Sequence, residues 1–196
     1  MLSGTTTELA AINRMLHVIG ESPAGSMISL PDDGLTARRI LEDVTREVLV
    51  EGWHFNTDER FPLMAEATAP HGIPIPVTAT SIDLSCNTEF DLVPRGGRLY
   101  DRRKKTFSFP GRTFYADITW YFPFDELPEA LRQYVLIKAA RQFAGGDLPS
   151  SLIHGLTEQR EMEKRVLWET EDARQADYNL LRQNRTINRI NDREAG

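Results

Sequence analysis

Four histidines are the side chains most suited to binding a metal or moving a proton near neutral pH. They stand far apart in the chain, at His17, His54, His71 and His154. No two lie three or four residues apart, so the paired histidines of a helical zinc motif are absent from the sequence. We interpret His17 and His54 as packing or surface residues. The histidines therefore predict no metal centre.

Nucleophiles, paired carboxylates and glycines define no catalytic site either. Cys86 follows Ser85 without a placed base, so we favour a half-buried cysteine, and a single cysteine forms no internal disulfide. Carboxylate pairs such as Asp58/Glu59 are expected by chance among 29 acidic residues. The Gly96-Gly97 pair lacks the lysine and the spacing of a phosphate-binding loop. The sequence predicts no catalytic residue and no cofactor.

The strongest pattern is a run of positive charge between positions 95 and 112. Seven cations and one anion, Asp101, give 7 − 1 = +6 in a chain whose net charge is −6. One interpretation is that these cations blunt an exposed strand edge. The alternative is a contact surface for an acidic protein, and direct DNA contact is the least favoured because the chain is acidic overall. The candidate interface residues are Arg95, Arg98, Arg102, Arg103, Lys104, Lys105 and Arg112.

A second basic pattern lies at residues 183–196. Arg185, Arg189 and Arg193 recur at four-residue spacing, with two isoleucines among them. The segment is polar and has few core residues, so it is predicted to be either a disordered tail or an arm that orders on a partner. The spaced arginines and isoleucines suit docking onto a neighbouring subunit. These three arginines complete the set of candidate interface residues.

Two amphipathic helices are predicted to open the chain. The first begins after the threonines at 5–7 and ends at Gly20, and the second runs from Pro31-Asp32 to about Glu51, before Gly52. Their apolar stripes must be buried against each other or against a partner. The stripes are Leu9, Ile12, Leu16 and Ile19 in the first helix, and Ala37, Leu41, Val44 and Val48 in the second.

The middle of the chain, residues 53–122, is predicted to form a small antiparallel β domain. It is rich in proline, glycine, threonine and aromatic residues and shows no helical period. The central prediction is a hairpin in which Phe90–Val93 and Arg98–Asp101 are strands joined through Pro94-Arg95-Gly96-Gly97. Further strands are expected at Trp53–Thr57, Phe61–Leu63 at an edge, Phe107–Phe109 and Ala116–Tyr121.

The last third of the chain returns to a helical pattern. One helix begins near the acidic Asp125–Glu129 segment and ends at Gly145-Gly146, and another runs from Pro149 to about Arg182. The predicted class is therefore α+β: an antiparallel-packed bundle of about four helices, an inserted antiparallel β domain and a C-terminal arm. The expected divisions are 1–52 and 123–182 for the helical domain, 53–122 for the β domain and 183–196 for the arm.

Composition points to an ordinary folded protein. Hydrophobic residues make up 40% and charged residues 27% of 196 residues, which excludes collagen-like and wholly disordered chains. The first residues lack the pattern of a signal peptide, and no run approaches the length of a membrane span, so we expect a soluble protein made in a cytoplasm.

Several short motifs occur in the order in which a known family has them, over residues 9–180. They are Ala11–Asn13, Ile19–Pro23, Ala37–Leu41, Gly52–Asn56, Arg95–Arg102, Leu127–Glu129 and Ala140–Phe143. Together they resemble the tail tubular protein A family of short-tailed bacteriophages related to the T7 group, also called the adaptor or gatekeeper ring.

This resemblance implies a structural protein of the virion tail, made in the host bacterial cytoplasm. It implies a dodecameric ring of this chain below the portal protein, with tail tubular protein B, the nozzle, attached beneath it and tail fibres near the junction. DNA would pass through the channel without sequence-specific binding. Two alternatives stay open: a polysaccharide hydrolase activity, proposed for some members, and a cytoplasmic helical interaction module with no phage role.

Overall fold

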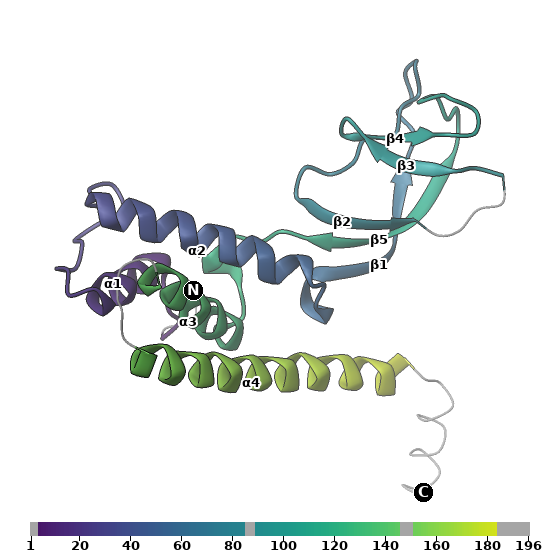
Figure 1. Cartoon of the computed structure of the whole chain (residues 1–196). Helices are drawn as coiled ribbons and strands as arrows, with labels where there is room; N and C mark the ends of the chain where they lie inside the picture. Colours follow the sequence, from purple (N-terminus) through teal and green to yellow (C-terminus); the bar gives the residue numbers. More distant parts are fainter. Residues whose placement is uncertain (1–3, 85–88, 146–150, 184–196) are drawn as a thin grey trace, which may run out of the picture. The chain divides into compact units, whose positions relative to one another are not determined.

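The computed structural model describes residues 4–84, 89–145 and 151–183, and it divides the chain into two compact units (Figure 1). The helical unit comprises Met1–Val48 and Pro123–Gly196, and the β unit comprises Leu49–Phe122. Four helices packed together and small antiparallel sheets confirm the predicted α+β class. The C-terminal segment with Arg185, Arg189 and Arg193 lies outside the described residues.

Helix α1 (Glu8–Val18) forms where its capping residues and apolar spacing predict it. The Thr7 side chain accepts a hydrogen bond from the Ala10 N–H at 3.2 Å, and the Glu8 carboxylate lies at the positive end of the helix. The helix ends before Gly20, whose φ of 86° is a conformation that glycine adopts without strain. Ile12 and Leu16 of the predicted stripe are fully buried.

Helix α2 (Asp32–Val50) buries the predicted stripe completely. Ala37, Leu41, Val44 and Val48 are each at most 1% exposed. The Thr45 hydroxyl is buried in the same helix and donates to the Leu41 carbonyl at 2.7 Å, which satisfies a polar group that the burial would otherwise isolate.

Helices α3 (Glu129–Ala144) and α4 (Ser151–Gln183) complete the helical unit. A short 3-10 turn, η2 (Phe124–Glu126), precedes α3, and Gly145 caps its end as predicted. Helix α4 packs on α3, with an ion pair between Arg141 and Glu161, and Trp168 of α4 is fully buried. Val166, also an apolar residue of α4, is 54% exposed.

The β unit has two antiparallel sheets. Strands β1 (Thr57–Met64) and β2 (Ala79–Leu84) flank β5 (Thr113–Trp120), and β3 (Leu92–Arg95) pairs with β4 (Arg98–Asp101). The predicted hairpin forms, but its first strand is Leu92–Arg95 and not Phe90–Val93, because Pro94 and Arg95 pair with Leu99 and Arg98. The turn is therefore Gly96-Gly97 alone, with φ angles of 58° and 73°. Pro62 lies in β1, an edge strand of the three-stranded sheet, as expected.

Two expected strands are wrong, for local reasons. Trp53–Thr57 contains a 3-10 turn, η1 (His54–Asn56), because the buried Asn56 side chain bonds three backbone groups. It accepts from the Trp53 N–H and donates to the carbonyls of Leu49 and Trp120. Phe107–Phe109 is a loop whose Phe109 N–H donates to the His71 carbonyl at 3.0 Å.

One hydrophobic core holds the β unit together. Inward-facing residues of the three-stranded sheet meet Leu99 of β4 and residues of the connecting loops. Phe90, Phe109 and Phe114 contact one another edge to face or tilted, with ring centroids 5.1–6.3 Å apart. The buried members of this core are Leu63, Ile73, Leu99, Phe109, Phe114, Ala116 and Ile118.

Candidate interaction surfaces

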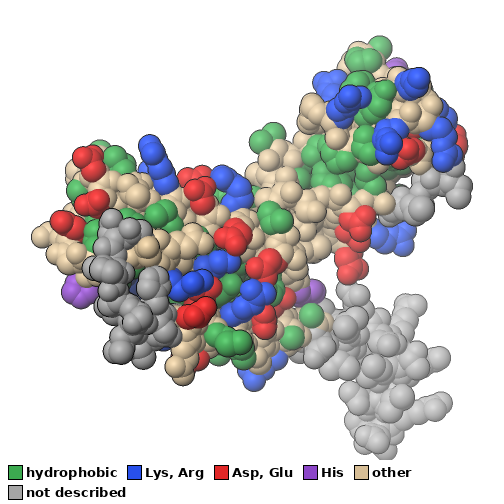
Figure 2. All heavy atoms as spheres, in the orientation of Figure 1, with side chains coloured by type: hydrophobic (Ala, Val, Ile, Leu, Met, Phe, Trp, Pro, Cys, Tyr) green, Lys and Arg blue, Asp and Glu red, His purple; other side chains and the backbone are tan. Residues whose placement is uncertain are grey.

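The β3–β4 hairpin and the turn after it bring the predicted cations together on one side of the β unit. Figure 2 shows Lys and Arg side chains gathered there. Arg95 and Arg98 flank the hairpin turn, the next four cations form the turn after β4, and Arg112 precedes β5. We call this set the basic patch: Arg95, Arg98, Arg102, Arg103, Lys104, Lys105 and Arg112.

Asp101 shapes the turn that carries four of these cations. Its side chain is fully buried, and its Oδ1 accepts hydrogen bonds from the backbone N–H groups of Arg103 at 2.9 Å, Lys104 at 3.2 Å and Asp91 at 3.4 Å. Burial alone raises the pKa of Asp101, but these N–H donors outweigh it and hold the pKa below its usual value. A carboxylate therefore folds the backbone so that the cations project outward.

Carboxylates from outside the charged run neutralise part of it. Arg102 lies 3.8 Å from Asp91, and Glu89 pairs with Lys104 at 3.0 Å and with Arg112 at 3.8 Å. The hydrogen bond from Lys104 lowers the pKa of Glu89, so this acid stays ionised. Arg98 pairs in the same way with Glu66 at 3.7 Å.

The net charge of the basic patch is therefore smaller than the net charge counted along the sequence. Seven cations oppose Asp101 and the three acids that the fold places beside them, so the sum is 7 − 4 = +3. Arg95 and Lys105 are exposed members for which no ion pair is formed by the described residues. They are the cations best placed to meet an external carboxylate.

Aromatic rings support the cations. The Lys104 ammonium lies 3.8 Å from the centroid of Phe90, and the Arg112 guanidinium lies 5.5 Å from the same ring. Arg95 lies 5.0 Å from the Tyr100 ring, which contacts Phe107 at 4.7 Å. Cation–π contacts of this kind hold long side chains in place, so less entropy is lost when a partner binds.

Sequence reasoning missed the neutralising acids, although the hairpin contains the signal. Because Arg95 lies opposite Arg98, the residue numbers of any two directly opposed residues in the hairpin add up to 193. The same sum places Asp91 beside Arg102 and Glu89 beside Lys104, and both pairs form ion pairs. Nothing comparable in the sequence points to Glu66, which reaches Arg98 from the segment after β1.

A second polar cluster lies inside the helical unit. Arg132 of α3 is buried and donates to three backbone carbonyls: from Nε to Leu127 at 2.7 Å, from one terminal nitrogen to Thr6 at 2.8 Å, and from the other to Asp125. These bonds tie the segment before α1 to the turn before α3.

Glu129 holds the same N-terminal segment from the other side. Its carboxylate accepts from the Thr6 N–H at 2.8 Å, the Thr6 hydroxyl at 2.7 Å and the Gln133 amide at 2.7 Å. Burial raises the pKa of Glu129, but the Thr6 and Gln133 hydrogen bonds outweigh it, and its pKa lies below the usual value. Glu129 and Arg132 of α3 thus anchor Thr6, and the role of the cluster is structural.

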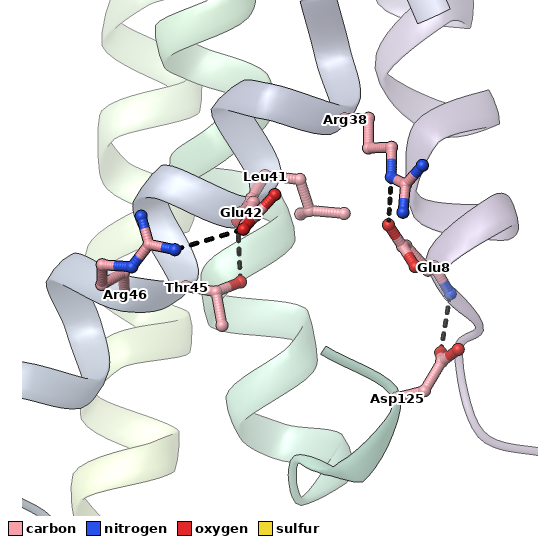
Figure 3. A network of polar contacts seen from close by, with 7 residues as sticks. All are labelled: Glu8, Arg38, Leu41, Glu42, Thr45, Arg46 and Asp125. Carbon is pink, nitrogen blue, oxygen red and sulfur yellow. Dashed lines mark hydrogen bonds and ion pairs between the residues drawn. The ribbon is translucent and has the colours of Figure 1, made fainter. Parts of the chain in front are cut away.

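Exposed polar contacts continue this anchor toward α2. In Figure 3, the Glu8 carboxylate faces Arg38 of α2 at 3.1 Å, and the Glu8 N–H donates to Asp125 at 2.8 Å. On α2 itself, Arg46 pairs with Glu42 at 3.2 Å. Exposed pairs such as these stabilise a fold only slightly, by about 0–1 kcal/mol each.

The other residues with chemical potential are dispersed. His17 and His54 are exposed on separate elements, and His71 lies in a loop with its Nδ1 3.1 Å from the Glu66 carbonyl. Cys86 and the side chain of His154 lie outside the described residues. Within the described part of the chain, no three His, Cys, Asp or Glu side chains are grouped as metal ligands, and no helix has the length and apolarity of a membrane span.

A family model described as tail tubular protein matches residues 9–178, which takes in α1 to α3, the β unit and most of α4. No curated protein matches the sequence.

Proposed function

Because this chain belongs to the tail tubular protein family, and is thus a structural component of a phage tail, we propose that it is the adaptor of that tail. In this role it forms a dodecameric ring that joins the portal protein above to the nozzle, tail tubular protein B, below. The family match over residues 9–178 supports the role in the tail. The ordered short motifs, which resemble the A type, favour the adaptor over the nozzle.

The charge distribution supports such a role. The chain carries −6 overall, and a channel wall of like charge lets DNA slide without binding it. The cations gather instead on the hairpin side of the β unit, beside carboxylates and aromatic rings. A polar surface of this composition is typical of contacts between proteins, where charges set orientation and encounter rate. The tail fibres are further partners in this proposal.

Electron microscopy of the purified protein mixed with the portal protein of the same phage tests the adaptor role. A ring of this chain bound to the portal supports the proposal, and two non-interacting species overturn it. Adding the nozzle protein then tests the second junction. A ring that binds the nozzle directly and never the portal would assign the chain to another position in the tail.

The C-terminal segment is the part we propose to dock on the portal. Arg185, Arg189 and Arg193 repeat at four-residue spacing, which places them on one side of the chain if the segment continues as a helix on binding. A variant that ends at Gln183 is expected to bind the portal at least tenfold more weakly. A matched variant that keeps the segment and replaces the three arginines by glutamine separates the charge from the chain length. Unchanged portal binding by both variants would exclude this docking.

A further inference from the structure

Two faces of the β unit lie on opposite sides of its core. In β4, Leu99 points into the core, so its neighbours Arg98 and Tyr100 point away from the core, to the outer face of the hairpin. In β5, Ala116 points into the core, so Asp117 points to the outer side of the three-stranded sheet. One compact unit thus presents two different surfaces in opposite directions.

The outer surface of the sheet has a partly apolar character. Strand register places Pro62 of β1 opposite Tyr115 of β5 and Met64 opposite Thr113. Met64 is 64% and Tyr115 46% exposed, which is unusual for large apolar side chains on a sheet face. Arg60, in the bulge of β1, lies over the Tyr115 ring at 5.7 Å. We call this surface, with Asp83 and Asp117, the sheet face.

Two carboxylates on the sheet face stand directly opposite each other. Asp83 of β2 pairs in register with Asp117 of β5, and both are exposed. Like charges at opposed positions repel each other, and among the described residues Asp117 accepts one hydrogen bond, from the Arg60 N–H at 2.8 Å. Counting the exposed Glu59 of the same bulge, three acids oppose Arg60, so the formal charge is 1 − 3 = −2.

We propose that the basic patch of one copy docks on the sheet face of the next copy. The proposal rests on the adaptor ring proposed above. The two surfaces have opposite charge, +3 and −2, and a partner cation would relieve the Asp83–Asp117 repulsion. A cyclic ring needs two different, complementary surfaces on each subunit, since every copy contacts its neighbours through a heterologous interface. The β unit carries both surfaces on opposite sides.

Complementary charge reversal tests this contact. The hairpin variant carries Arg95→Glu and Lys105→Asp. Aspartate suits position 105, whose φ is 52°. The sheet variant carries Glu59→Lys and Asp83→Lys. The substitutions change the two surfaces to 3 − 4 = −1 and −2 + 4 = +2, respectively. A control variant, Arg160→Glu with Arg174→Glu, changes the net charge by the same −4 as the hairpin variant, but at exposed positions of α4.

Each variant is mixed with the portal protein of the same phage, and ring formation is followed by electron microscopy and sedimentation. Wild type and control are expected to form rings. Either reversed variant alone is expected to lose them, since its two surfaces have charges of the same sign. An equal mixture of both variants is expected to restore rings with alternating subunits, because every interface again joins opposite charges. Circular dichroism of each variant checks that it is folded.

The outcomes separate this inference from the adaptor role. If both reversed variants form rings alone, or if the folded mixture does not restore them, the contact between copies is excluded. If the hairpin variant forms rings on the portal but no longer binds the nozzle, the basic patch faces the nozzle, and this inference is overturned while the adaptor role stands. If wild type forms no ring on the portal, the adaptor role itself fails.

Discussion

Replacing Arg132 by methionine gives the sharpest test of how the helical unit is held together. The guanidinium of Arg132 is buried and donates to the carbonyls of Leu127, Thr6 and Asp125. Methionine fills a similar volume but donates nothing. The carbonyls of Thr6 and Leu127, both on buried residues, then lose a partner, which costs about 1–3 kcal/mol each.

The loss is expected to be large compared with the total stability. Removing one partner of a buried charged network costs about 3–5 kcal/mol in measured cases, and the two carbonyls counted here give a similar sum. Native domains are stable by about 5–15 kcal/mol, so the variant should keep a much reduced margin. Arg38 serves as the matched control. It is an arginine paired with Glu8, but its side chain is 49% exposed, so Arg38→Met should cost at most about 1 kcal/mol.

Urea unfolding followed by circular dichroism measures both variants, and hydrogen exchange of the Thr6 amide reports the anchored segment directly. That amide donates to Glu129 at 2.8 Å and should exchange much faster in Arg132→Met. If Arg132→Met does not fold, Arg132→Lys retains the charge and part of the bonding and should lie between the wild type and that loss. A cost for Arg132→Met no larger than that for Arg38→Met would refute the anchor.

Three other perturbations test single features of the two units. The pKa of Glu129 is lowered in the folded protein, so the Glu129 carboxylate stabilises the fold above its unfolded-state pKa of about 4.3. This stabilisation disappears as the pH falls through the folded-state pKa. In urea unfolding, the stability difference between wild type and Glu129→Gln should therefore be smaller at pH 3 than at pH 7. Asp101→Ala removes the acceptor of the turn amides, so the Arg103 and Lys104 amides should exchange about tenfold faster, and unchanged exchange would contradict the assigned role. Gly97→Val forces a β-branched residue to a φ of 73°, although no neighbour lies within 4 Å of the added Cβ, and thermal unfolding should show a loss of stability of about 1–2 kcal/mol. The control Gly25→Val also has no close neighbour, and its stability should stay within about 0.5 kcal/mol of the wild type.

The helices could be predicted from the sequence because their signals are local. Caps, stop glycines and apolar spacing act over three or four residues, and α1 and α2 follow them closely. Burial on α4 could not be predicted in the same way, since Val166 and Trp168 are both apolar and lie two residues apart. Trp168 is fully buried, whereas Val166 is 54% exposed. Which side of an apolar helix faces its neighbours is decided by the tertiary structure.

The β unit was less predictable because its strands depend on distant partners. Strand β2 was missed although Ile82 and Leu84 alternate with exposed residues, since its pairing residue, Ile118, lies far along the chain. Trp53–Thr57 has the alternation of a strand, but the Asn56 side chain accepts from the Trp53 N–H and donates to the carbonyl of Leu49 in α2, which stabilises a turn. Alternation alone does not distinguish a paired strand from a turn stabilised by a side chain.

The charge of the basic patch illustrates why a site in such a unit needs the fold before its chemistry can be judged. Counted along the chain, positions 95–112 carry +6, and this number would favour any strongly acidic ligand, nucleic acid included. The hairpin register then brings Asp91 and Glu89 beside Arg102 and Lys104, and the remaining +3 is held against aromatic rings. A phosphate backbone selects for high charge density, whereas a contact between proteins selects for paired charges in fixed positions. The folded patch has the second character, and for this reason we propose that it contacts a protein and not a nucleic acid.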